Sequence, residues 1–133
     1  MTLKKRAPGF DEYLAGGFLA NAPILFFTYA VKTLLPEEAP LPEMEIASIF
    51  IVVLGGIVAG YLVARRGDSD HIRTGLKTGL SAFLVNSAFS SIILTGTTLQ
   101  YMLMILTLFC LTAILGACLR KITTKRALAE SHR

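Results

Sequence analysis

The stretch GFLANAP, residues 17 to 23, carries an asparagine and a proline in the middle of an apolar run. The stretch AFLVNSA, residues 82 to 88, has the same order of phenylalanine, leucine and asparagine. A side-chain amide surrounded by hydrocarbon must find a hydrogen-bonding partner within the protein. We therefore expect Asn21 and Asn86 to lie between packed helices near mid-membrane, bound to each other or to a nearby backbone carbonyl.

The composition assigns both stretches to a membrane protein. The chain has 133 residues, of which 53% are hydrophobic and only 17% are charged, whereas a soluble domain carries about 25% charged residues. A helix that crosses the bilayer core needs about 20 apolar residues. The sequence therefore predicts an all-α fold, a single polytopic membrane domain over residues 1–133 built as a four-transmembrane-helix bundle. The expected spans are residues 13–35, 44–64, 72–95 and 99–119.

The N-terminal segment has some features of a signal peptide. Lys4, Lys5 and Arg6 precede the first apolar run, and Ala20-Asn21-Ala22 has the small-residue pattern of a cleavage site. Pro23 would then be the first residue after the cut, which we expect to block cleavage. We therefore expect this segment to be retained as the first membrane helix.

The basic residues predict the orientation of the chain. Of its 13 lysines and arginines, all but Lys32 fall on one side of a four-span topology, and cytoplasmic segments carry such an excess. The sequence thus predicts a multi-pass protein of the cell (cytoplasmic) membrane with both termini in the cytoplasm. Short basic segments attract anionic lipid headgroups, so the bilayer accounts for the net charge of +4 without a nucleic-acid partner. The residues expected at the headgroups are Arg65, Arg66, Arg73, Lys77, Arg120, Lys121, Lys125 and Arg126.

The two halves of the chain resemble each other. Aligning Asn21 with Asn86 also matches Phe18 and Leu19 with Phe83 and Leu84. The second and fourth runs align in the same way through their leucines and small residues. This pattern predicts a duplicated helical hairpin, with repeats 1–66 and 67–133 related by a twofold axis along the membrane normal. Chance similarity between apolar helices is the alternative.

Small residues recur at helical spacing in the second and fourth runs. Glycine and alanine faces let membrane helices approach closely. Such a face predicts either packing inside the bundle or a contact with another subunit, and both alternatives remain open. The residues concerned are Gly55, Gly56, Ala59, Gly60, Ala113, Gly116 and Ala117.

Polar residues of the first and third runs are the candidates for an intramembrane path. Pro23 lacks an N–H, so it leaves the carbonyl of Leu19 without its helical donor and favours a kink. That carbonyl is then a natural acceptor for an amide. A path along the two helices is one interpretation, and hydroxyl groups that bond to their own backbone are the other. The candidates are Asn21, Pro23, Asn86, Ser87 and Ser91.

No set of residues in the sequence predicts catalysis. A nucleophile with a base and an orienting group is not visible, and neither His71 nor His132 has a paired metal ligand. Asp68, Asp70 and His71 form a weak candidate for a cation site, but a helix cap by Ser69 or Asp70 is the simpler explanation. We therefore expect no enzyme activity, catalytic residue, metal or cofactor.

The segment LGGIVAGYLVARRGDSDHIRTGLKTGL, residues 54 to 80, resembles small four-helix integral membrane proteins of unknown function from archaea and bacteria. The likeness lies in Gly55, Gly56 and Tyr61 at one helix end and in Gly75 and Gly79 at the start of the next. It implies the same fold and no particular activity.

These observations favour an accessory, assembly or scaffolding subunit of a larger membrane complex, held through glycine-faced helix contacts. The expected partners are the lipid bilayer and other membrane-protein subunits, or a second copy of the chain. The alternative is a small homodimeric transporter or channel with a polar path along the first and third helices.

Overall fold

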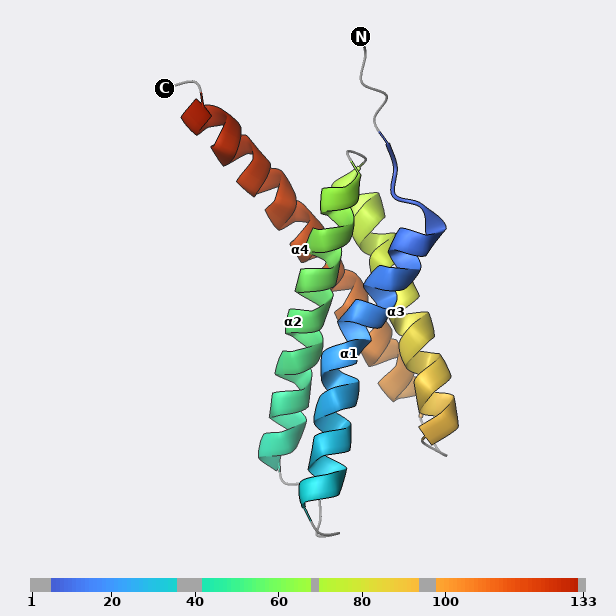
Figure 1. The fold of residues 1–133 in the computed structure, drawn as a ribbon. Helices are drawn as coiled ribbons and strands as arrows, with labels where there is room; N and C mark the ends of the chain where they lie inside the picture. The colour runs from blue at the N-terminus through green and yellow to red at the C-terminus, as the bar shows by residue number, and fades with distance from the viewer. Residues whose placement is uncertain (1–5, 36–41, 68–69, 94–97, 132–133) are drawn as a thin grey trace.

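The computed structural model describes residues 6–35, 42–67, 70–93 and 98–131 (Figure 1). Within them the chain forms four α-helices and no strands, which confirms the all-helical fold. Most helix bounds lie within a few residues of the expected spans, and the fourth helix is longer. The helices are α1 (Phe10–Leu34), α2 (Pro42–Arg66), α3 (His71–Ile93) and α4 (Leu99–Ser131).

Three of the helices, α1, α2 and α4, are long and apolar enough to cross a membrane, which indicates a membrane protein. Helix α3 is more polar, but two of its threonines, Thr74 and Thr78, face inward. Thr74 and Thr78 are 2% and 0% exposed, and the Thr78 hydroxyl donates to the carbonyl of Thr74 at 2.8 Å. Mean hydropathy counts these two buried threonines in the same way as exposed polar residues, although their polarity is not presented to the surroundings of the bundle.

Local hydrogen bonds define where α1 and α3 begin. The backbone N–H of Gly9 donates to the Glu12 carboxylate at 2.8 Å, as in a capping box. The N–H of Ile72 donates to the Asp70 carboxylate at 3.1 Å, so Asp70 serves the start of α3. Asp68 and Ser69, which belong to the candidate cation site and cap, lie outside the described residues. No cluster of metal-ligating side chains occurs among the residues that are described.

The helices pack with α2 and α3 in the centre. Each of these two contacts the three other helices, whereas α1 and α4 make no contact in the described ranges. A twofold exchange of α1 with α3 and of α2 with α4 would require a contact between α1 and α4 to match that between α2 and α3. The packing therefore does not follow the symmetry of the expected repeat, which stays a prediction.

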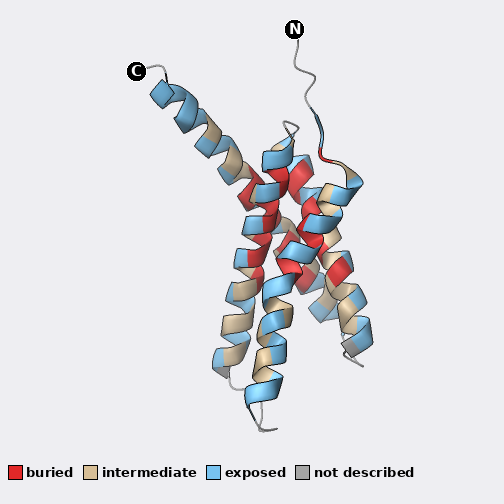
Figure 2. Cartoon of the chain, in the orientation of Figure 1, coloured by how far each residue is buried: buried red, intermediate tan, exposed pale blue. Residues whose placement is uncertain are grey.

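The core lies in the middle of the bundle and extends toward the end at which α1 begins (Figure 2). Small side chains dominate it, and Phe109 is the largest side chain that is completely buried. Near the other end, α1 and α2 carry exposed and half-buried residues (Figure 2). The central cluster consists of Ala20, Val52, Ala59, Ala82, Ile105 and Phe109.

Helix α4 continues past the bundle. It runs to Ser131 rather than ending near Leu119, and its last turns diverge from the other helices (Figure 1). Every residue from Lys125 to Ser131 is exposed. The expected span 99–119 therefore covers only part of α4, and the basic tail continues it as helix through the described residues. We call the segment Arg120–Ser131 the α4 extension.

Candidate functional site

Helices α2 and α4 cross with their backbones in direct contact. A Cβ atom placed on Gly60 would overlap the carbonyl of Ala113, and one placed on Gly116 would overlap the carbonyl of Ile57. A Cβ on Gly56 would meet the Thr112 side chain. The absence of side chains at these glycines is what allows the two helices to approach so closely.

The remaining small residues of this face are also covered by the chain itself. Gly55 lies against the backbone of Ala20 on α1, and Ala59, Ala113 and Ala117 are at most 1% exposed. The predicted contact residues therefore do make helix contacts, but inside one bundle. The alternative in which Gly56 and Gly60 hold another subunit is wrong, because α4 already occupies that face.

Three further glycines, Gly75 and Gly79 on α3 and Gly17 on α1, also allow close helix contacts, a role that is not predicted from the sequence above. A Cβ on Gly75 would lie 2.5 Å from Cα of Ile114, and one on Gly79 would lie 2.6 Å from Cα of Cys110. On α1, a Cβ on Gly17 would lie 2.6 Å from the Ser81 hydroxyl. The four-residue spacing of Gly75 and Gly79 was the available signal, and it is the same as that of Gly56 and Gly60.

Asn21 joins α1 to α3. Its Nδ2 group donates to the carbonyls of Gly17 and Ala82, both at 2.8 Å. The side chain is 1% exposed, and its Oδ1 atom has no partner among the described groups. The partner across the interface is thus a backbone carbonyl, as one of the two alternatives expects. On its own helix Asn21 uses the carbonyl of Gly17 rather than that of Leu19.

Replacing Asn21 with leucine should weaken the bundle modestly. The change removes both side-chain hydrogen bonds, and interhelical bonds of this kind contribute about 0.6 kcal/mol on average and up to about 1.7 kcal/mol in membranes. We expect the free energy of unfolding, measured by reversible unfolding in denaturing detergent, to fall by an amount in that range. Ser91→Ala is the control, since the exposed Ser91 hydroxyl bonds only to Ser87 of its own helix. Equal stability of the Asn21→Leu variant and the wild type would contradict this role.

The other polar candidates do not gather around Asn21 in a hydrogen-bonded group. Asn86 is half-buried and Pro23 is exposed inside a continuous α1. Ser91 donates to the carbonyl of Ser87 at 2.8 Å, and the buried Ser87 hydroxyl has no partner among the described groups. Direct contact of α1 and α3 at Gly17 and Ser81 packs the interface there.

The basic candidates gather at the end of the bundle where α1 begins and α2 ends, which we call the basic end (Figure 1). Arg73 is paired with Asp70 at 3.6 Å, and Lys77 lies 5.6 Å from the centre of the Tyr13 ring. Lys121, Lys125 and Arg126 lie on the α4 extension, together with half-buried Arg120. Lys4, Lys5 and Arg133 are outside the described residues.

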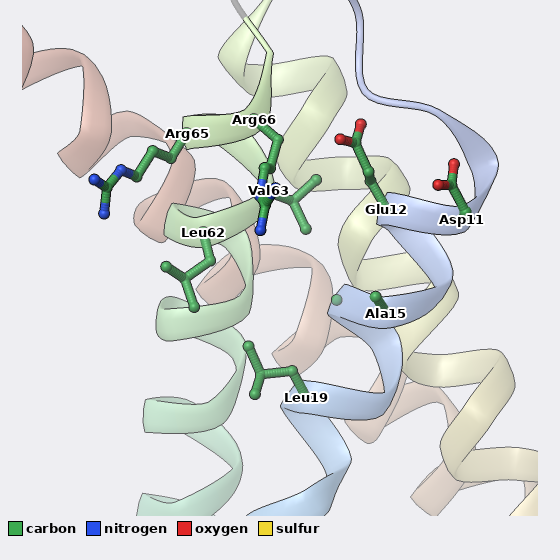
Figure 3. Close-up of a pocket in the computed structure, with 9 residues that line it drawn as sticks. Asp11, Glu12, Ala15, Leu19, Leu62, Val63, Arg65 and Arg66 are labelled. Atoms are coloured by element: carbon green, nitrogen blue, oxygen red, sulfur yellow. The ribbon is translucent and has the colours of Figure 1, made fainter.

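A pocket of about 880 Å³ opens at the basic end between α1 and α2 (Figure 3). Arg66 extends beside Val63 into the gap between the helices, and the Glu12 carboxylate stands across from it on α1 (Figure 3). Arg65 points away from this gap. The lining residues are Asp11, Glu12, Ala15, Gly16, Leu19, Leu62, Val63, Arg65 and Arg66.

Arg65 and Arg66 are expected at lipid headgroups from the sequence, which does not predict that they share a pocket with Asp11 and Glu12. The two pairs are far apart in the chain, and only the antiparallel packing of α1 on α2 places them at one pocket. No repeat of a motif or spacing in the sequence signals this arrangement.

Comparison with protein-family models, with curated proteins and with solved structures finds no match for this chain. The resemblance of residues 54–80 to small four-helix membrane proteins therefore stays a prediction.

Proposed function

We propose that the chain is a non-enzymatic accessory subunit of a larger membrane complex, and that its α4 extension binds the partner. In this proposal all four helices cross the cell membrane, and the N-terminus and the C-terminus of the chain both lie on the cytoplasmic side. The support for this orientation is the position of the basic residues. Arg6, Arg65, Arg66 and Arg73 are at the basic end, whereas Lys32 is at the other.

The observation that carries the partner proposal is the exposed α4 extension. It leaves the bundle as a regular helix and presents basic side chains to solvent (Figure 1). A helix that lies in the membrane interface needs one apolar face. At 100° per residue, Arg120, Lys121, Lys125 and Arg126 are spread around the helix, and no such face is left. An acidic surface of another protein suits this helix better than the bilayer does.

The packing of Gly56 and Gly60 inside the bundle also supports the α4 extension as the surface that binds the partner. Because α4 covers Gly56 and Gly60 within the chain, contact with another subunit has to use an outer surface. Charge complementarity between such surfaces steers association and fixes specificity.

The double substitution Lys125→Glu and Arg126→Glu should release the partner. Both side chains are exposed and outside the bundle, so the fold should be unchanged while the attraction for an acidic surface becomes repulsion. We expect the complex purified in mild detergent to lose most of its partner, and the wild-type complex to weaken at high salt because exposed charges are screened. The measurement is the subunit ratio by native mass spectrometry.

Lys32→Glu is the matched control, because Lys32 is an exposed cation at the opposite end of the bundle. It should leave the subunit ratio unchanged. A wild-type protein that purifies as a single species without other chains would sink the proposal, as would a double variant that keeps its partner.

A homodimeric transporter is the second candidate. The observation in its favour is the pair of buried oxygen atoms, Asn21 Oδ1 and Ser87 Oγ, that lack a partner among the described groups and so can hold water or a polar substrate. A native mass that corresponds to two copies of this chain and no other protein would favour it over the accessory role.

A further inference from the structure

The pocket between α1 and α2 has an apolar wall below a charged rim. Its wall includes Leu19 and Leu62, which remain 41% and 38% exposed although they face the same gap. Gly16 lets α1 approach α2 closely beside the pocket, because a Cβ there would lie 2.5 Å from Val63 Cγ2. Leu62 lies about one helical turn deeper than Arg65 and Arg66 on α2, and Leu19 lies about two turns deeper than Asp11 and Glu12 on α1. The pocket can therefore hold a molecule with a polar head and an apolar body.

The charges on the rim are not equivalent. Glu12 is already engaged, since it accepts the Gly9 N–H at 2.8 Å and pairs with Arg6 at 3.6 Å. Arg66 has no carboxylate within ion-pair distance in the part of the chain that is described. Asp11 likewise has no cationic partner there, and it is exposed. Arg65 is also unpaired there but points away from the gap (Figure 3), so the unpaired charged groups available to a ligand are the Arg66 guanidinium and the Asp11 carboxylate.

The position of the pocket across the membrane decides which molecules can reach it. Arg66 is the last residue of α2, which is one of the helices apolar enough to cross a membrane. A residue at that position lies where the hydrocarbon ends and the lipid headgroups begin. Leu19 and Leu62 each keep more than a third of their surface exposed, so the apolar wall is open to the region of the acyl chains.

We propose that this pocket binds one phospholipid whose headgroup carries an amine. The Arg66 guanidinium holds the phosphate, as guanidinium groups commonly do. The Asp11 carboxylate holds the ammonium group, and one acyl chain lies along Leu19 and Leu62. The free carboxylate disfavours a headgroup that has a phosphate but no cation, so the site selects phosphatidylethanolamine over phosphatidylglycerol.

The experiment measures phospholipid retained by the purified protein and the affinity for each lipid added back in detergent, both by native mass spectrometry. Wild type should retain one phosphatidylethanolamine molecule. Arg66→Gln should weaken its binding at least about tenfold, the size expected for the loss of one charge-assisted hydrogen bond. Asp11→Asn should bind both lipids alike. Arg73→Gln is the control, because Arg73 is an exposed arginine outside the pocket that pairs with Asp70.

Leu62→Trp provides a second variant that keeps every charge and fills the apolar wall. It should also lose the lipid, and its helix content by circular dichroism should match that of wild type. Equal retention by wild type and Arg66→Gln would overturn the proposal. So would a wild-type preference for phosphatidylglycerol, or displacement of the lipid by millimolar inorganic phosphate, which would mark a site for free phosphate.

Discussion

Gly60→Leu should abolish the folded bundle. The added side chain would begin inside the backbone of α4 at Ala113, and a backbone cannot rotate away as a side chain can. Overpacking costs about 1–3 kcal/mol of folding stability even where neighbouring side chains can adjust. We therefore expect Gly60→Leu to lower the free energy of unfolding by at least about 3 kcal/mol. The measurement is the midpoint of unfolding in a mixture of mild and denaturing detergents.

Val58→Leu is the matched control, because Val58 lies on the same helix and is 47% exposed. The same kind of side chain placed there should leave stability unchanged. If Gly60→Leu unfolds at the wild-type midpoint, then α2 and α4 do not touch through Gly60, and the description of the crossing is wrong.

Phe109→Ala should produce the second large effect. Phe109 is 0% exposed and belongs to the central cluster, so its removal leaves a cavity. In water such a substitution costs about 3–5 kcal/mol. In a membrane the unfolded helices are already surrounded by hydrocarbon, which removes much of the transfer contribution and leaves the lost packing. We expect about 2 kcal/mol in the same unfolding assay.

Leu111→Ala serves as its control. Leu111 is on the same helix but 58% exposed on the outside of the bundle, where lipid replaces the lost contacts. If Leu111→Ala lowers the free energy of unfolding as much as Phe109→Ala does, then Leu111 and not Phe109 faces the inside of the bundle.

The helices themselves are predictable from the sequence because their signal is local. Long charge-free runs predict α1, α2 and α4 with nearly correct starts, and the spacing of Gly56 and Gly60 predicts a close helix contact. Which partner the glycine face contacts is not predictable in this way. Whether a glycine face meets another helix of the same chain or another subunit depends on the arrangement of all the helices.

The length of α4 shows another limit of hydropathy. The apolar run ends near Leu119, but Lys, Arg, Ala and Leu are good helix formers, and the helix continues through them to Ser131. Hydropathy reports the solvent that a segment prefers rather than where its backbone stops being helical. The pocket is not predictable from the sequence for a related reason, because Asp11 and Arg66 line one pocket only after α1 and α2 have packed.

The central claim is that the more polar α3 crosses the membrane together with the other helices. The most direct test places single cysteines at Ala7, Thr33 and Ala127, all exposed, in a background with Cys110→Ala and Cys118→Ala. A maleimide that cannot cross membranes is then applied to sealed vesicles. Four spans predict that positions 7 and 127 are labelled from one side and position 33 from the other. Labelling of position 127 from the same side as position 33 would leave α3 outside the bilayer and contradict the account.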